Sequence, residues 1–356
     1  MRVLIAPDSF GDTLTAVEAA SAIGEGWAAG RPDDEIALAP QSDGGPEFVD
    51  VLAARFGRTV TERVVGPLGA AISAQWLLDD RDPDRLVAYI ECAQACGLHQ
   101  LGGGPTLRTA QAADTYGVGL LVDAALRAGV REIVVGLGGS ATTDGGYGLI
   151  DALGGSARAV ERVADVALIA ASDVENPLLG PLGAATVFGP QKGADPQTVA
   201  RLEERLAQWS RVLASMAGRD VSVEPGAGAA GGLGAALLAL GADRVSGATV
   251  VGDATAQGAE MARADLVLTG EGKFDSQTLR GKVVSALTAA ATEVNAPTVV
   301  FAGQVALTAD EIAAAGISRA YSIVDQAGSV ELAMSDARNQ LTALAARAAA
   351  SWRTDG

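Results

Sequence analysis

The sequence predicts an α/β fold with two domains, one with a mainly parallel sheet and the other a mixed-sheet α/β domain inserted into it. Three observations predict this fold. Short apolar runs alternate with helical periodicity toward both ends of the chain, as in βαβ units. A central stretch alternates in the manner of antiparallel strands. The chain also has 356 residues, which exceeds the size at which a single hydrophobic core stops growing.

The strands of the parallel sheet are predicted at short, uniformly apolar runs that end in polar, glycine-rich loops. Uniform apolarity is typical of strands that are covered on both faces. Helical periodicity follows the first run, at Val17, Ala20, Ile23 and Trp27, and follows the fourth over residues 283–291. The runs are residues 3–6, 36–39, 133–135, 266–268 and 298–301, and a last run at 321–324 leads into a long alanine-rich C-terminal helix.

The middle of the chain has a different pattern. Alternation of apolar and polar residues over 58–92 predicts antiparallel strands, and Gly-Pro-Leu-Gly at 66–69 predicts a turn between two of them. Further along, Asp195 and Pro196 predict the start of a helix, whose apolar stripe is Leu202, Leu206, Trp209 and Leu213. We therefore expect one domain over residues 1–44 and 258–356 and the inserted domain over 45–257. The strand at 133–135 could belong to either domain.

The charge of the chain limits its partners. There are 26 Lys and Arg against 43 Asp and Glu, a formal net charge of −17. An acidic surface repels phosphate backbones and anionic lipid, so we expect neither nucleic-acid nor membrane binding. No stretch of about 18 apolar residues runs without Gly, Pro or a charged residue, so the sequence predicts no membrane-spanning helix. An anionic substrate would need a local positive site, because the overall field opposes its approach.

The two cysteines, Cys92 and Cys96, favour a cytoplasmic protein. Their spacing, with three residues between them, fits neither a zinc ribbon nor a thioredoxin motif. We expect them to be small buried residues that remain thiols in a reducing compartment. The apolar N-terminal residues 1–6 are too short for a signal peptide and predict the first strand instead.

Four polar loops follow predicted strands and carry the candidate chemistry. They combine glycine with Ser, Thr or carboxylates, at residues 7–12, 41–45, 138–146 and 269–277. Ligands of open parallel sheets bind beyond the carboxyl ends of the strands. Glycines let backbone N–H groups converge on an anion, and carboxylates hold Mg²⁺ or orient a hydroxyl. These loops therefore predict one shared polar cleft.

Two further segments belong with these loops. Residues 189–194 place Lys192 between glycines, which suits a phosphate contact, although a solvated surface lysine is the alternative. Residues 225–235 are rich in glycine and fit either a phosphate-binding nest before a helix or close helix packing on small residues. The single histidine, His99, has no triad or metal partners in the sequence, and no P-loop motif is present. Proton transfer would then fall to a carboxylate or a lysine.

Together these motifs resemble the bacterial type 1 glycerate kinases over essentially the whole chain. The resemblance rests on Ala6-Pro7-Asp8-Ser9-Phe10 and on residues 138–146, 189–194, 225–235 and 269–282. It implies a flavodoxin-like domain, a second domain, and an active site in the cleft between them. It also implies a kinase that uses ATP and Mg²⁺ to convert D-glycerate into phosphoglycerate; the 2-kinase type is expected, and the choice between the 2-hydroxyl and the 3-hydroxyl stays open. Whether the protein is a monomer or a homodimer stays open.

The resemblance, with the predicted nest, assigns the candidate site residues. Asp275 is the expected general base, Lys192 the phosphate contact, and Asp43 a third catalytic residue. Asp43 and Asp173 are also the candidates for a metal site. The substrate and nucleotide contacts are expected at Ser9, Ser140, Asp144, Asp173, Asn176, Gly231, Gly232, Glu271, Ser276 and Gln277.

The sequence departs from the family pattern at the first loop. Gly11 stands where the family usually has a lysine after the aromatic residue, and in the second loop the acidic residue is displaced by one, to Glu47. In the segment 95–97, Cys96 replaces the usual serine. Losing a charged hydrogen-bonded contact costs about 1.5–3 kcal/mol. Two hypotheses follow: a kinase for glycerate or a related hydroxy acid, or a kinase-like protein that binds nucleotide or metabolite without turnover.

Overall fold

The computed structural model describes residues 1–276, 278–280 and 283–353. The chain forms two compact units by its internal contacts. The first comprises Met1–Ser42 and Val251–Gly356, and the second comprises Asp43–Val250. The sequence-based boundaries were placed at 44/45 and 257/258, a few residues further along the chain in each case. Each unit is described by itself below.

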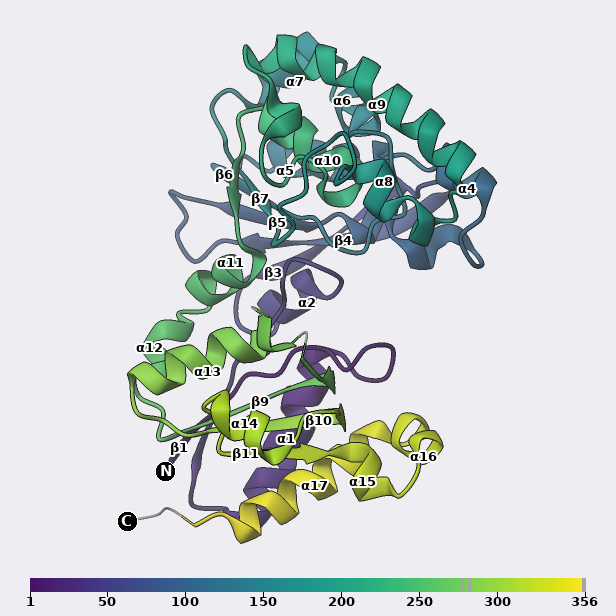
Figure 1. Cartoon of the computed structure of the whole chain (residues 1–356). Coiled ribbons are helices and arrows are strands. Elements are labelled where there is room, and N and C mark those ends of the chain that lie inside the picture. The colour runs from purple at the N-terminus through teal and green to yellow at the C-terminus, as the bar shows by residue number, and fades with distance from the viewer. Residues whose placement is uncertain (277, 281–282, 354–356) are drawn as a thin grey trace. The chain divides into compact units, whose positions relative to one another are not determined.

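The first unit contains a five-stranded sheet in the order β11-β10-β9-β1-β2, and all its neighbouring strands are parallel (Figure 1). Most of the predicted runs form these strands, but β9 and β10 extend several residues beyond them. The run predicted at 321–324 is wrong in its second half, because β11 ends at Ser322 and a helix begins at Ile323. β2 lies at the sheet edge, where it is only partly covered. The strands are β1 (Arg2–Ile5), β2 (Glu35–Leu38), β9 (Leu266–Phe274), β10 (Thr298–Val305) and β11 (Arg319–Ser322).

Helices cover both faces of this sheet because successive strand residues point to opposite sides. Val3 and Ile5 contribute to a core with the long helices α1 and α17, while Leu4 contributes to a second core with α12 and α13. The predicted C-terminal helix is present, but two short helices precede it. The helices are α1 (Ala16–Gly30), α12 (Gln257–Met261), α13 (Val283–Glu293), α14 (Ala309–Ala314), α15 (Ile323–Ala327), α16 (Val330–Ser335) and α17 (Ala337–Ser351), with a 3₁₀ turn at Thr278–Arg280.

The second unit contains a six-stranded mixed sheet in which the strands follow their chain order. The first three strands are antiparallel, as the alternation over 58–92 predicts, and the last four are parallel to one another. The strand predicted at 133–135 belongs to this sheet. The strands are β3 (Arg58–Val65), β4 (Ala71–Asp79), β5 (Val87–Glu91), β6 (Glu132–Gly136), β7 (Ala167–Ala171) and β8 (Asp243–Val245).

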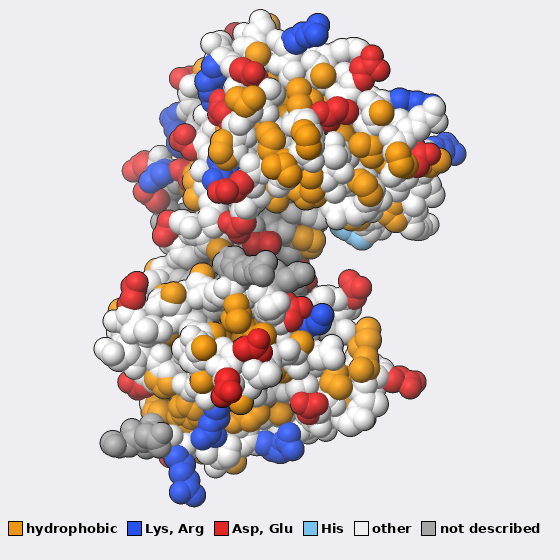
Figure 2. All heavy atoms as spheres, in the orientation of Figure 1, with side chains coloured by type: hydrophobic (Ala, Val, Ile, Leu, Met, Phe, Trp, Pro, Cys, Tyr) orange, Lys and Arg blue, Asp and Glu red, His pale blue; other side chains and the backbone are white. Residues whose placement is uncertain are grey.

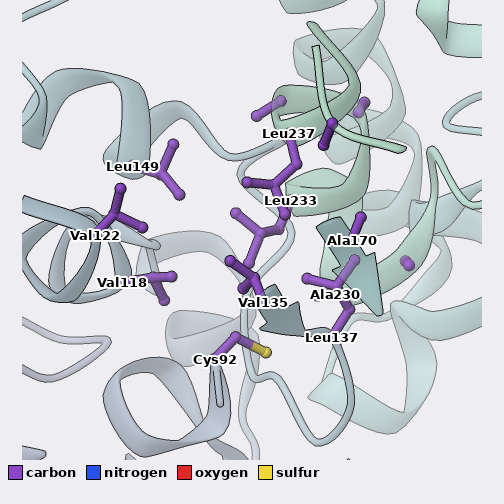
Figure 3. Close-up of a cluster of buried hydrophobic side chains, with 14 of the residues drawn as sticks. Cys92, Val118, Val122, Val135, Leu137, Leu149, Ala170, Ala230, Leu233 and Leu237 are labelled. Carbon is purple, nitrogen blue, oxygen red and sulfur yellow. The ribbon is translucent and has the colours of Figure 1, made fainter. Parts of the chain in front are cut away.

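The core of the second unit lies between this sheet and its helices. Val118 and Val122 of α5, Leu149 of α6 and Leu233 of α10 gather with strand residues in one buried cluster (Figure 3). Helix α9 begins after Asp195, whose side chain caps it by accepting from the Thr198 N–H, as predicted. The helices are α2 (Phe48–Ala53), α3 (Ala93–Cys96), α4 (Leu107–Ala112), α5 (Tyr116–Arg127), α6 (Tyr147–Ala152), α7 (Ser156–Val163), α8 (Ala184–Phe188), α9 (Pro196–Ala217) and α10 (Ala229–Ala239), with 3₁₀ turns at Leu98–Leu101, Pro190–Lys192 and Val221–Val223; α11 (Gly247–Ala254) connects to the first unit.

The surface carries charges of both signs. Figure 2 shows acidic, basic and hydrophobic side chains interspersed over the face in view, without a large basic patch there. Among the helices of the described residues, none has the length and apolar character needed to cross a bilayer. Cys92 and Cys96 are free and buried, which confirms the prediction that they are small buried residues.

Candidate active site

In the first unit, the first loop lies against the end of β9. The Asp8 N–H donates to the Gly270 carbonyl at 2.8 Å, and the Thr269 hydroxyl donates to the Ala6 carbonyl at 2.8 Å. Both bonds hold the loop beyond β1 at the carboxyl edge of the sheet, where ligands of parallel sheets bind. Ser9 therefore lies on a fixed loop, with its own N–H donating to the Asp8 carboxylate at 2.7 Å.

The fourth predicted loop is shorter than the sequence indicates, because β9 continues through residues 269–274 in register with β10. Glu271 is thus a buried strand residue rather than a loop residue. Asp275 follows the strand, and its carboxylate lies 3.2 Å from the ammonium of Lys273, a side chain that is 61% exposed. Ser276 is exposed. Gln277, predicted as a contact, lies outside the described residues, as do residues 281–282 of the matching segment.

In the second unit, the turn at residues 43–48 crosses the carboxyl edge of the parallel strands. The Gly138 N–H donates to the Gly44 carbonyl at 3.0 Å, and the Gly45 N–H donates to the Asp43 carboxylate at 3.0 Å. A Cβ atom on Gly138 would clash with the Gly45 backbone, so only glycine permits this approach. The turn and the loop at 138–146 are therefore in direct contact.

The two candidate metal ligands occur at this same edge. Gly44 lies against the carbonyl of Ala171, the last residue of β7, and Asp173 follows two residues later. Asp43 and Asp173 are both exposed. Within residues 1–276, 278–280 and 283–353, no cluster of three or more His, Cys, Asp or Glu side chains suits a metal ion.

Lys192 is buried, so the alternative of a solvated surface lysine is wrong. Its side chain is enclosed in the second unit, at 3% exposure. The ammonium donates to the Ser140 hydroxyl at 3.1 Å and to the Thr142 carbonyl at 2.6 Å. Burial lowers the pKa of Lys192 to about 8, because an apolar setting disfavours the charged form. At neutral pH the loop at 138–146 therefore lies over a buried positive charge.

Asp144 anchors this loop from within. Its carboxylate is buried and accepts from the backbone N–H and hydroxyl of Thr115 at 2.9 and 2.7 Å, and from the N–H groups of Gly146 and Gly148 at 3.2 and 3.0 Å. A carboxylate with four donors already has its hydrogen-bonding capacity filled. Sequence reasoning missed Thr115, which precedes α5 and lies 29 positions from Asp144; nothing in its local pattern identifies it.

Asp144 also reaches the wall of a cavity of about 470 Å³ on the α9 side of the loop. Tyr147 and Trp209 line this cavity in an edge-to-face contact with ring centroids 5.1 Å apart. Arg205 lines it too, and donates to the Thr143 carbonyl at 2.8 Å. The loop at 138–146 is therefore held by Lys192 and by Arg205.

The glycine-rich segment before α10 packs against the same loop. Ala230, Gly231 and Gly232 have left-handed backbone angles, with φ of 49°, 68° and 93°. A Cβ on Gly231 would clash with the Thr142 carbonyl, so this glycine permits close packing, while phosphate binding by Gly231 and Gly232 stays a prediction. Asn176 lies nearby and is engaged structurally, since its amide donates to the Leu182 carbonyl at 2.8 Å.

Sequence reasoning also missed Glu91, the last residue of β5. It lies in register with Gly136 of β6, beside the turn at 43–48, and it is 3% exposed. Burial raises the pKa of Glu91 to about 8. An acidic residue at the end of the apolar run 87–90, directly before the two buried cysteines, was the available signal.

Known proteins match this chain in sequence over segments that include the loops described above. The model of the glycerate kinase family matches residues 3–161 and 155–353. An uncharacterised protein of Mycobacterium tuberculosis is 56% identical over 356 residues, which cover 100% of this chain and 93% of the relative. The glycerate kinase of Halalkalibacterium halodurans is 38% identical, covering 93% of each chain. The glycerate 2-kinase of Escherichia coli is 34% identical, covering 96% of this chain and 95% of the relative.

A solved structure is similar to this chain in fold and also in sequence. The crystal structure of a candidate glycerate kinase 2 from Salmonella typhimurium LT2 has a TM-score of 0.79 and 36% identity, and the match covers 99% of this chain and 98% of that one. The family match spans both units, including the segments that contain Ser9, Ser140, Lys192 and Glu271. The chain therefore belongs to the glycerate kinase family.

Proposed function

We propose that this protein is an ATP-dependent kinase that phosphorylates D-glycerate, or a closely related small hydroxy acid, at its 2-hydroxyl group. One observation carries the proposal most directly: a buried ammonium, that of Lys192, lies under the family loop at 138–146. The relatives named as glycerate kinases support the acceptor, and the relative named as a glycerate 2-kinase supports the hydroxyl.

Lys192 supplies the positive charge that the phosphates require. Its pKa of about 8 keeps most of the ammonium protonated at pH 7. A charge in a poorly solvated setting acts strongly on nearby anions, and a chain with a net charge of −17 needs such a local site. Ser140, which the ammonium contacts, is the side chain through which this charge reaches a bound phosphate.

Asp43 and Asp173 fit a magnesium ion bound jointly with the nucleotide. Mg²⁺ prefers oxygen ligands and is commonly held by one or two carboxylates together with substrate phosphates. Both carboxylates are exposed at one edge of the second sheet, and among the described residues Asp173 has no hydrogen bond or ion pair that would occupy it. When bound, Mg²⁺ neutralises charge on the phosphates. The two aspartates would hold it.

The acceptor hydroxyl needs a base, and Asp275 is the proposed one. It lies directly after β9, where the chain leaves the sheet. A carboxylate can accept the hydroxyl proton as the phosphoryl group is transferred. Ser9 and Glu271 lie at the same edge of the first sheet and are proposed to orient the hydroxy acid through hydrogen bonds.

The second hypothesis, binding without turnover, is favoured by Gly11. This residue is exposed, and a Cβ placed on it would have nothing within 4 Å. The lysine that the family usually has here is absent, so one positive charge is missing from the first loop. Either hypothesis keeps the nucleotide site of the second unit.

A product assay tests the proposal. The purified protein is incubated with Mg²⁺, ATP and D-glycerate, and ADP is measured with and without the acceptor. Added enolase converts 2-phosphoglycerate directly, whereas 3-phosphoglycerate is detected only when a mutase is also added. We expect acceptor-dependent ADP and an enolase signal without mutase. ATP binding without acceptor-dependent ADP, over a panel of small hydroxy acids, would support the second hypothesis instead.

A further inference from the structure

Glu91 is a buried carboxyl group that the proposed reaction does not use. It ends β5, whose other residues are all buried and uncharged, and it faces Gly136 across the parallel pair β5–β6. Buried acidic residues normally have a cationic partner. Within the described part of the chain, no Lys or Arg forms an ion pair with Glu91, so its partners must be sought elsewhere.

The partners of Glu91 are backbone N–H groups at the start of α2. Its carboxyl accepts from the Val49 N–H at 3.4 Å, and the backbone N–H of Glu47 also favours its charged form. The first N–H groups of a helix have no acceptor within the helix. Glu47 also has a φ of 74°, a left-handed conformation that is unfavourable for residues other than glycine. Glu91 thus provides a hydrogen-bond acceptor for the backbone of a strained turn, at the point where the first N–H groups of α2 have none.

This turn leads directly to the proposed catalytic edge. Gly45 binds the Asp43 carboxylate, and Gly44 accepts from Gly138 at the start of the loop that covers Lys192. A Cβ on Gly136 would meet the Gly44 carbonyl at 2.7 Å, so the turn also rests on the strand beside Glu91. Movement of Glu47 would therefore be transmitted to Asp43 and to the loop at 138–146.

We propose that Glu91 is a positioning residue for the phosphoryl-transfer site: by accepting from the Val49 N–H, next to the strained turn at Glu47, its buried carboxyl holds the turn that carries Asp43 against Gly138. The consequence for activity rests on the proposed kinase function. The consequence for the conformation of the turn does not.

The charges around Glu91 make this contact sensitive to pH. Glu47 and Asp50 face it from the α2 side and Cys92 adjoins it in the chain, while β6 presents only Gly136. Burial first, and these two acidic neighbours second, raise its pKa to about 8. The Glu91 carboxyl is therefore protonated in the observed conformation at neutral pH. As the pH rises above this pKa, ionisation favours conformations in which the carboxylate is exposed to water. Above pH 8 the turn should loosen.

The test compares Glu91→Gln, which keeps an uncharged acceptor, with Glu91→Ala, which removes it. Full-length proteins are assayed for kcat and kcat/KM with D-glycerate from pH 6.5 to 9.5. We expect wild-type kcat to fall above about pH 8. Glu91→Gln should stay within threefold of wild type at pH 7 and show a shallower alkaline decline, because only the deprotonation of Lys192, whose pKa is also about 8, then remains. Glu91→Ala should lose at least tenfold in kcat. Asp50→Asn serves as a matched control, because removing one acidic neighbour should move the decline to lower pH.

Hydrogen exchange at residues 43–48 and 138–140 provides a readout that needs no turnover. Exchange should be faster in Glu91→Ala than in Glu91→Gln at pH 7, and faster in the wild type above pH 8 than in Glu91→Gln. An alkaline decline as steep in Glu91→Gln as in the wild type, or equal exchange in all variants, would overturn the proposal. Exchange that behaves as expected in a protein without kinase activity would refute the proposed function and leave the positioning role intact.

Discussion

The Lys192 ammonium donates a hydrogen bond to the Ser140 hydroxyl at 3.1 Å, and both groups are buried. These residues are 52 positions apart in the chain, and the contact joins the turn at 190–192 to the loop that follows β6. A buried charge is costly unless it has partners. The Ser140 hydroxyl and the Thr142 carbonyl are those partners, so the loop and the lysine hold each other in place.

Replacing Lys192 by methionine should lower kcat at least a hundredfold, the usual effect of removing one preorganised donor from a charged transition state. Stability should respond in a distinctive way to pH. The folded-state pKa of about 8 lies below the ordinary value of 10.5, so wild-type stability rises as pH increases from about 8 to 10.5, by at most about 1.4 kcal/mol per pH unit. The variant lacks this rise.

Urea unfolding of both proteins at pH 7.5 and pH 9.5 measures this effect. The stability of Lys192→Met relative to the wild type should decrease between the two pH values. A constant difference would mean that Lys192 is not the desolvated base described here, whatever the change in kcat.

Asp144→Asn should destabilise the fold by about 2–4 kcal/mol, because the new NH₂ group would face N–H donors that now point at a carboxylate. A double-mutant cycle with Thr115→Ala locates the effect, and we expect a coupling energy above 0.5 kcal/mol. Loss of activity without loss of stability would show instead that Asp144 contacts the substrate or the nucleotide directly.

The sequence predicted the elements whose signal is local. The apolar runs located β1, β2, β6, β9 and β10, although they left β7 and β8 unpredicted. Asp195 located the start of α9, and the Gly-Pro-Leu-Gly sequence located the turn between β3 and β4. The extension of β9 through Glu271 and Lys273 could not be predicted in this way. Polar residues there adopt strand geometry because β10 continues beside them as far as Val305, and this pairing depends on the tertiary fold.

The burial of the functional side chains could not be predicted from the sequence either. Lysine is rarely buried, so the sequence left Lys192 open between a phosphate contact and a surface residue. The ammonium donates to the Thr142 carbonyl in the 138–146 loop, and this loop packs against the segment at 230–232, where Thr142 contacts Ala230, 88 positions further along the chain. Glu91 could have been suspected, because an acidic residue at the end of an apolar strand needs an explanation. Its partners, Glu47 and Val49, are not evident from sequence.

Asp275→Asn should lower kcat by about 10²–10⁴ while leaving the fold intact, since removing a general base has an effect of this size. The ion pair with Lys273 should contribute little to stability, because the lysine is mostly exposed and screened by solvent. Lys273→Met is the control for loss of the pair alone. Turnover of the asparagine variant close to that of Lys273→Met would remove Asp275 from the role of base.

Gly11→Lys tests the departure from the family in the first loop. The site has room, since nothing lies within 4 Å of a Cβ placed there, and Gly11 adjoins Gly272 at the end of β9. However, φ at Gly11 is 60°, so any side chain pays about 1–2 kcal/mol for the left-handed backbone. Gly11→Gln has the same free-energy cost for the left-handed backbone but adds no charge, so it is the matched control.

Both variants should therefore lose a similar amount of thermal stability, and only the lysine variant should gain in kcat/KM for D-glycerate. A tenfold gain requires about 1.4 kcal/mol, which one cation near the carboxylate or the transferring phosphoryl group can provide. Equal kcat/KM in the two variants, with any hydroxy acid, would mean that position 11 does not act on the substrate. Loss of an existing activity toward another acceptor in Gly11→Lys alone would identify the glycine as a specificity device, which leaves room for a larger or less anionic substrate.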